Sequence, residues 1–145
     1  VADKIIEFAN LDTQINLAIS LHSANQSFRE TIMPIAKKYN LEELKKACLY
    51  YANKTNRQLF FEYALTDKNT SQNDAQLLAN FIHSHHLFFV NLIPLNPVED
   101  GLDCATKEQQ EKFMNSLDQL GIIYSLRRSF GQKFSAACGQ LATNK

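Results

Sequence analysis

Apolar residues along this chain recur at two alternating spacings, one typical of strands and one typical of helices. Every second position is apolar in four segments that we expect to be strands: 14–22, 58–66, 86–95 and 122–128. Every third or fourth position is apolar in segments that we expect to be helices: 2–9, 41–54 and about 72–84. A further helix is expected over 107–120, where this spacing begins at residue 113. The stretch around Pro34 shows neither spacing and is predicted to be irregular.

Turn and capping residues support these boundaries. Ser71 or Asn73 is a suitable N-cap for the helix after residue 71, Thr106 is one for the helix after residue 106, and Gly121 ends that last helix. A helix between consecutive strands allows those strands to pair in parallel. Either a doubly wound sheet or part of a β/α barrel would satisfy the pattern.

The first strand favours the barrel. Its odd positions are apolar, whereas its even positions are small or polar: Asn16, Ala18, Ser20 and His22. A strand covered by helices on both faces would be apolar throughout, so the polar row suggests a face toward a ligand-filled interior. We therefore predict an α/β fold in which four parallel strands alternate with helices as part of a β/α barrel.

Glu62 supports a functional interior but also has a simpler explanation. It lies among the bulky strand residues Phe60, Phe61 and Tyr63, where an ionised carboxylate needs a partner. A glutamate facing the barrel interior and a glutamate in a structural ion pair are equally consistent with the sequence.

The composition describes one globular domain of 145 residues with 15 basic and 15 acidic residues. Zero net charge gives no overall attraction to nucleic acid, although basic residues gather near the end of the chain, where they could contact RNA phosphates or only water: Arg127, Arg128, Lys133 and Lys145. No apolar run approaches the roughly 20 residues that cross a bilayer, and the first residues lack the plan of a signal peptide. We expect a cytoplasmic protein that does not bind membranes.

The three cysteines differ in their surroundings. Cys48 lies on the apolar face of a helix and is expected in the core, and Cys104 lies in a loop without an evident role. Cys138 stands in a segment of small residues after the basic end of the last strand, a setting that favours a reactive thiolate. Their spacing fits no metal site, and the histidines at 83, 85 and 86 indicate a polar turn more readily than a set of metal ligands.

Five segments together carry a resemblance to a known family. These are Leu17 to Ser23, Arg29 to Ile35, Phe61 to Tyr63, Asn91 to Pro97 and Ala136 to Leu141. In this order they resemble the carboxy-terminal half of the radical S-adenosylmethionine (SAM) methyltransferases that methylate adenine in RNA, the RlmN and Cfr group. The resemblance implies that residues 1–145 form the carboxy-terminal part of a TIM-like radical SAM barrel, with the cluster-binding half and an amino-terminal RNA-binding domain lying outside this sequence.

The activity implied by the resemblance is methylation of carbon 2 of an adenosine in 23S ribosomal RNA and, in many members, in tRNA. The segments 61–63 and 91–97 look more like this branch than like the Cfr branch, which modifies carbon 8. Two alternatives stay open: a carbon 8 methyltransferase, and a non-catalytic half-barrel that serves in binding or assembly.

The resemblance also implies roles for residues and cofactors. Cys138 matches the cysteine that accepts a methyl group from one SAM, while a second SAM is cleaved at a 4Fe-4S cluster to a radical that attacks this S-methyl group. The positions that match SAM contacts are Ser20, Leu21, His22 and Asn96. Before Cys138 the family usually has Arg-Gly-Asp-Asp-Ile, whereas this chain has Phe-Gly-Gln-Lys-Phe at 130–134. The altered loop bears on the expected orientation of the thiol or on its RNA contacts.

Several parts of the family's machinery are missing from this sequence. The cluster motif C-x-x-x-C-x-x-C and the second, resolving cysteine are both absent. We therefore expect the iron ligands to lie outside this chain and the chain alone to be inactive. A half-barrel would leave the strands at 14–22 and 122–128 as open edges, so we also expect the isolated chain to self-associate.

Overall fold

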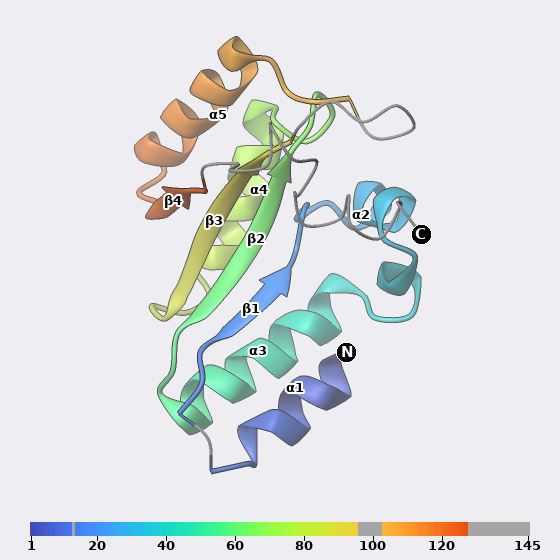
Figure 1. Cartoon of the computed structure of the whole chain (residues 1–145), viewed down its shortest axis with the longest axis vertical. Coiled ribbons are helices and arrows are strands. Elements are labelled where there is room, and N and C mark those ends of the chain that lie inside the picture. The colour runs from blue at the N-terminus through green and yellow to red at the C-terminus, as the bar shows by residue number, and fades with distance from the viewer. Residues whose placement is uncertain (13, 96–102, 128–145) are drawn as a thin grey trace, which may run out of the picture.

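The computed structural model of the chain describes residues 1–12, 14–95 and 103–127. It contains an α/β fold (Figure 1) whose elements follow in this order: α1 (Ala2–Ala9), β1 (Leu17–Ser20), α2 (Gln26–Ile32), the 3-10 helix η1 (Pro34–Lys37), α3 (Leu41–Thr55), β2 (Leu59–Leu65), α4 (Gln72–Ile82), β3 (Phe88–Pro94), α5 (Lys107–Gln119) and β4 (Tyr124–Leu126). The four strands form one sheet in which every neighbouring pair is parallel, as predicted.

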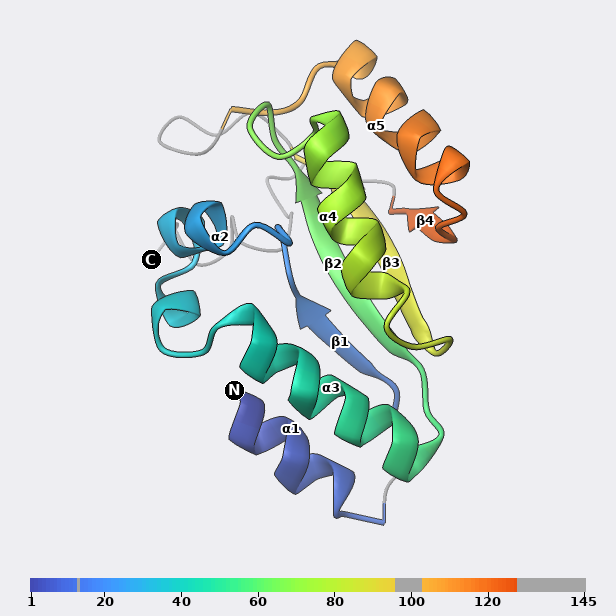
Figure 2. The same ribbon diagram turned by 180° about the vertical axis from the view of Figure 1, so that it is seen from behind.

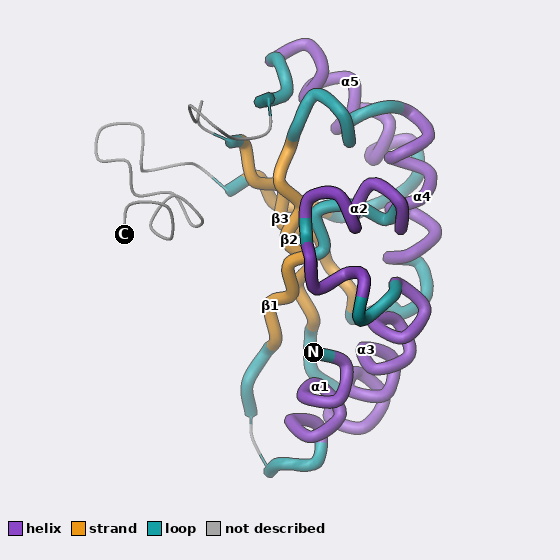
Figure 3. Tube along the Cα trace, turned by 90° about the vertical axis from the view of Figure 1, so that its right-hand side faces the viewer, coloured by secondary structure: helices purple, strands orange, loops and turns teal. Residues whose placement is uncertain are grey.

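The strand order distinguishes between the two predicted architectures. The strands lie side by side in the order β1-β2-β3-β4, without the reversal that defines a complete doubly wound sheet. The helices α3, α4 and α5 cover the same face of the sheet (Figures 2 and 3), and no described element covers the other face. This is the arrangement of a segment of a β/α barrel, with the uncovered face corresponding to the barrel interior.

Aromatic packing fixes the helices to the sheet. Phe61 of β2 is fully buried and meets Phe81 of α4 and Phe88 of β3 edge to face, with ring centroids 5.2 and 5.0 Å apart. Tyr63, also fully buried, stacks on Phe113 of α5 at 5.4 Å. Because these side chains alternate with half-exposed ones along β2, one face of the strand supplies the core and the other is left for a different role.

The capping predictions are confirmed. Ser71, and not Asn73, is the N-cap of α4, and its hydroxyl accepts a hydrogen bond from the backbone N–H of Asp74. Thr106 caps α5 in the same way, in a reciprocal box with Gln109. Gly121 follows α5 with a φ of 72°, a left-handed conformation that suits glycine. These caps fix where each helix begins or ends relative to the strands.

Two predictions at the start of the chain were wrong in part. The strand predicted over 14–22 is confined to β1, because His22 adopts a φ of 58° and the chain leaves the sheet there. The segment predicted to be irregular contains α2 and η1. Asn25 caps α2, and Pro34 occupies the first turn of η1, where a missing N–H has no cost.

The remaining predicted helices and the strands β2 and β3 are confirmed, with ends that differ slightly from the predicted limits. The strand predicted over 122–128 is present as β4 but spans only Tyr124–Leu126, and residue 128 lies outside the described residues. No helix within the described ranges is both long and apolar enough to cross a membrane.

Candidate functional site

A row of polar side chains crosses the uncovered face of the sheet. Ser20 of β1 is in register with Glu62 of β2, Glu62 with Asn91 of β3, and Asn91 with Ser125 of β4. Since Phe61 and its counterparts point toward the helices, these four residues share the open face. We call them the polar row.

An apolar layer lies beneath the polar row, toward the amino ends of the strands. Ala18, Phe60 and Phe89 are in register there, and the rings of Phe60 and Phe89 stack with centroids 5.8 Å apart. Layers of side chains stacked along the axis are typical of barrel interiors. Among the paired strand residues of this face, hydrogen-bonding side chains therefore begin at the polar row.

Partners within the sheet hold the polar row in place. The Ser125 hydroxyl donates a hydrogen bond to Oδ1 of Asn91. Nη1 of Arg127 lies 3.3 Å from Oε1 of Glu62, and the two side chains are 53% and 23% exposed. The partner that Glu62 required is thus Arg127, so this glutamate both faces the open side and forms an ion pair. Arg127 is the one described member of the basic group predicted near the end of the chain; residues 128, 133 and 145 lie outside the described residues.

The carboxyl end of β1 is tied down by its backbone. The N–H groups of Leu21 and His22 both donate to the carbonyl oxygen of Glu62, each at 3.0 Å. The carbonyl oxygen of Leu21 accepts from Nε of the buried Arg29 at 3.2 Å, and the Leu21 side chain is fully buried. Of the three residues predicted here, Ser20 and His22 therefore offer side chains to a ligand, whereas Leu21 anchors the turn.

The imidazole of His22 is held in one tautomer. The backbone N–H of Ala64 donates to its Nδ1 at 3.0 Å, so Nδ1 carries no proton and the neutral ring must carry one on Nε2. Burial of the ring, and to a lesser extent the positive charge of Arg29, lower the pKa of His22 to about 4. At neutral pH the ring therefore presents an Nε2–H donor, for which no acceptor lies among the described residues.

The structure brings together only some of the predicted site residues. Ser20, Leu21 and His22 lie at the carboxyl end of β1, where barrel enzymes place their sites. Asn96 and Cys138 lie outside the described residues, so their roles stay predictions. Neither Asn91 nor Ser125 was individually predicted to have a role, although a polar residue at an alternate position of each strand is a usable signal.

The other cysteines and histidines contribute no second site. Cys48 is fully buried, as predicted, and burial raises the pKa of its thiol to about 12. Cys104 pairs with Thr66 in an isolated bridge, and partial burial and the nearby Asp103 raise its pKa. Residues 83, 85 and 86 lie at the opposite, amino end of β3. Within the described ranges, no group of three potential metal-ligating side chains comes together.

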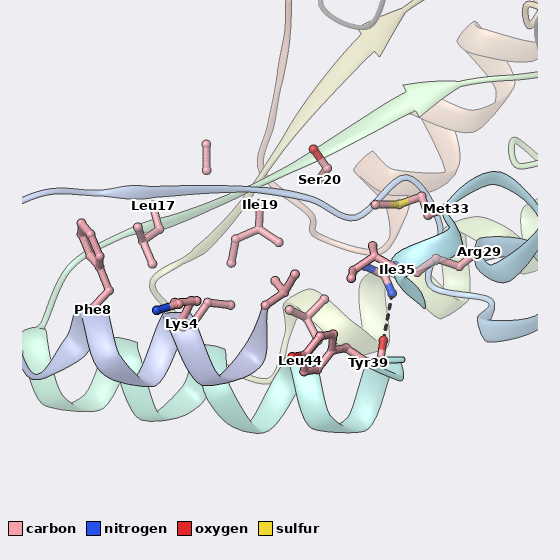
Figure 4. Close-up of a pocket in the computed structure, with 13 residues that line it drawn as sticks. Lys4, Phe8, Leu17, Ile19, Ser20, Arg29, Met33, Ile35, Tyr39 and Leu44 are labelled. Carbon is pink, nitrogen blue, oxygen red and sulfur yellow. Dashed lines mark hydrogen bonds between the residues drawn. The ribbon is translucent and has the colours of Figure 1, made fainter. Parts of the chain in front are cut away.

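An apolar pocket of about 450 Å³ lies beside β1, on the helix side of the strand (Figure 4). Leu17 and Ile19 point into it, whereas Ser20 points to the other side of the strand. Arg29 borders the pocket and donates to the carbonyl oxygen of Tyr39 at 3.4 Å. Further members of the lining are mainly aliphatic or aromatic: Ile5, Phe8, Met33, Ile35 and Leu44. The pocket thus lies mainly on the helix side of β1 at the open edge of the sheet, and of the polar row only Ser20 borders it.

Comparison with known proteins gives close matches along the entire chain, although no protein-family model matches it. A "probable dual-specificity RNA methyltransferase RlmN" from Listeria welshimeri is 46% identical over 149 aligned positions, which include 100% of this chain and 41% of the relative. A protein of the same name from Clostridium botulinum is 43% identical over 97% of the chain and 41% of its own length. The chain therefore spans about two fifths of the length of these relatives.

Solved structures give the same result. A radical SAM methyltransferase from Sphaerobacter thermophilus superposes with a TM-score of 0.90 at 37% identity, over 97% of this chain and 41% of that one. A domain of a pyruvate-formate lyase-activating enzyme from Bacteroides vulgatus matches with a TM-score of 0.62 at 17% identity, covering 88% and 73% of the two chains, which supports the fold alone. The predicted fold class, a part of a radical SAM enzyme, is confirmed.

Proposed function

Because the chain is homologous to part of the RlmN radical SAM RNA methyltransferases, we propose that it is the carboxy-terminal part of an enzyme that methylates carbon 2 of an adenosine in 23S ribosomal RNA and in tRNA. The observation that carries the proposal is the 46% identity to an RlmN relative, in an alignment that covers the whole chain. The turn Ser20-Leu21-His22 lies at the carboxyl edge of the sheet, where barrel enzymes place their sites. The whole protein's activity belongs to a longer chain than this one.

The residues at this edge fit the binding of SAM. The Ser20 hydroxyl is exposed, and the Nε2–H of His22 is a donor for an acceptor atom of the cofactor, such as a ribose or carboxylate oxygen. Both groups stand on a rigid turn, which restricts the orientations that a bound ligand can adopt. Asn96, in the segment after β3, is the proposed further contact. When bound, the cofactor and the cluster supply the methyl group and the radical chemistry that side chains lack.

Cys138 is the proposed methyl acceptor of this chain. Its thiol would lose a proton and become a thioether, while SAM would lose its methyl group and leave as S-adenosylhomocysteine. Thiolate is the nucleophilic form, so nearby positive charge from the basic end of β4 would favour the step. The target adenosine must be unpaired or turned out of its stack to reach such a site.

The iron ligands are proposed to lie in the part of the full-length protein outside this chain. A cluster of this kind is held by cysteine thiolates. The structure describes two cysteines. Cys48 is fully buried in the core, and Cys104 belongs to no group of three potential metal ligands among the described residues. The 145-residue chain alone is accordingly proposed to be inactive.

The isolated chain is also proposed to self-associate. Exposed apolar side chains lie in its two edge strands or just before them: Ile15 before β1 is 50% exposed, Ile123 before β4 is 72% exposed, and Leu126 of β4 is 46% exposed. The apolar pocket also opens beside β1. The rest of the barrel would cover these surfaces in the full-length protein. Sedimentation velocity at increasing concentrations should show dimers or larger species of the 145-residue chain. A monomer that persists at millimolar concentration would contradict the proposal.

The central test is methylation by the full-length protein, reconstituted with iron and sulfide. It should incorporate one methyl group into 23S ribosomal RNA at carbon 2 of adenosine, as identified by mass spectrometry of the digested RNA. Cys138→Ala should abolish the product, whereas Cys104→Ala should retain it. A methyl group at carbon 8, or full activity of Cys138→Ala, would overturn the proposal.

A further inference from the structure

Asn69, in the loop after β2, uses its side-chain amide to join the ends of two strands. Its Nδ2 donates to the carbonyl oxygen of His22 at 2.8 Å and to that of Ala64 at 2.7 Å. Its Oδ1 accepts from the N–H and the hydroxyl of Thr66 at 2.8 and 2.9 Å. Asn69 is fully buried, and this set of bonds occupies the whole hydrogen-bonding capacity of the amide.

The core holds Asn69 in turn. The hydroxyl of Tyr63 donates to the carbonyl oxygen of Asn69 at 2.7 Å, and the Tyr63 ring is stacked on Phe113. The amide is therefore fixed at both its backbone and its side chain. A path of packed and hydrogen-bonded groups runs from the helix-covered core to the turn at His22.

His22 needs this support because its backbone is left-handed. A φ of 58° is unfavourable for a residue with a β-carbon and persists only where surrounding contacts enforce it. Three bonds do so: the His22 N–H binds the Glu62 carbonyl oxygen, the Asn69 amide binds the His22 carbonyl oxygen, and the Ala64 N–H binds the His22 ring. All three lead to the same short stretch of β2, since Asn69 also binds the carbonyl oxygen of Ala64.

We propose that Asn69 is a positioning residue, which fixes the turn at His22 against Ala64 so that the imidazole meets the cofactor only as an Nε2–H donor. This inference rests on the proposed function, because the ligand at this edge is taken to be SAM. Asn69 does not itself contact the cofactor: its amide is buried and fully engaged. It acts on binding through the orientation and tautomer of His22.

Two tyrosines allow a matched test in the full-length protein. Tyr63→Phe removes the hydroxyl that holds Asn69. Tyr51→Phe removes the hydroxyl of another fully buried tyrosine, which binds the carbonyl oxygen of Ile15 at the other end of β1 in a partly buried hydrogen bond. Each variant loses one hydrogen bond to a backbone carbonyl oxygen, so losses of stability of similar order are expected. Asn69→Ala should have the larger effect, because it removes all the hydrogen bonds of the amide. Its folding is to be checked by circular dichroism.

Two quantities are measured. Calorimetry gives the affinity for SAM, and NMR of histidine-labelled protein gives the tautomer of His22. The His22 signal is the one that disappears in His22→Asn. Tyr63→Phe should weaken SAM binding about three- to tenfold and populate the Nδ1–H tautomer, and Asn69→Ala should do both more strongly. Tyr51→Phe should leave the affinity within about twofold and the tautomer unchanged.

Equal losses of affinity in the two tyrosine variants would overturn the inference, since they would reflect general destabilisation. An unchanged His22 tautomer in a folded Asn69→Ala would also overturn it. If the unsubstituted full-length protein fails to bind SAM, the proposed function fails instead, while the NMR readout still decides whether Asn69 sets the tautomer.

Discussion

The two faces of the sheet place neighbouring residues of the same strands in opposite environments. On the helix-covered face Phe61, Tyr63 and Leu92 are fully buried in an apolar and aromatic core. On the open face the next residues in the chain, Glu62 and Asn91 among them, form the polar row. The difference shows that alternation along a strand is enough to separate the residues that stabilise the fold from those available to a ligand.

The open face also differs in how its polar groups are satisfied. Asn91 is paired with Ser125 and Glu62 with Arg127, so the row is internally bonded before any ligand arrives. Such pairing would matter in the proposed full-length barrel, where this face would be enclosed, because an enclosed polar group without a partner is destabilising. Ser20 and the Nε2 of His22, which lack such partners among the described residues, are the groups left for binding.

The largest expected effect separates two adjacent phenylalanines. Phe61→Ala should lower the free energy of unfolding of the 145-residue chain by about 3–5 kcal/mol, because it leaves a cavity among Phe81 and Phe88. Phe60→Ala should cost clearly less, since Phe60 lies on the open face and is only partly buried. Urea denaturation at low protein concentration measures both. Equal losses would mean that the open face is covered in this chain, for example by a second copy.

The second effect is a pH dependence carried by His22. Its pKa of about 4 in the folded chain lies below the ordinary value of 6.5, so unfolding takes up a proton between these values. The stabilising contribution of the neutral ring is present above pH 6.5 and is lost as the pH falls toward 4, and it amounts to about 3 kcal/mol.

A variant isolates this contribution from the carboxylates that titrate in the same range. Asn tolerates a left-handed backbone, so His22→Asn should keep the turn and reduce the loss of stability between pH 6.5 and pH 4 by the share that His22 contributes. His85→Asn serves as the control at the amino end of β3, where the pKa is also lowered by burial but the ring is less enclosed. A pH profile of His22→Asn that parallels the unsubstituted chain would disprove the assignment.

The sequence predicted an element of the fold correctly where its spacing of apolar residues was repeated over enough positions. β2, β3, α3 and α5 have 7 to 15 residues and were located correctly. α2 and η1 have 7 and 4 residues, too few for a helical period to emerge. The end of β1 depended on the left-handed turn at His22, which tertiary bonds from Glu62 and Asn69 impose.

The candidate site was predictable in position but not in detail. A resemblance marked Ser20, Leu21 and His22 as a group, and only coordinates separate the two exposed side chains from the buried one. The sequence marks Asn69 as no more than a turn residue, because its role depends on His22, 47 residues away. Partners that are distant in the chain leave no local signal.

The smallest expected effect belongs to the ion pair on the open face. Glu62→Gln and Arg127→Gln, alone and combined in a double-mutant cycle, should give a coupling energy below about 1 kcal/mol, because Arg127 is half-exposed and solvent screens the pair. The coupling should fall further in 1 M salt. A coupling energy above about 2 kcal/mol that does not fall in salt would mean that the pair is shielded from water. The open face would then be as protected from solvent as the helix-covered face, and the contrast between the two faces would be lost.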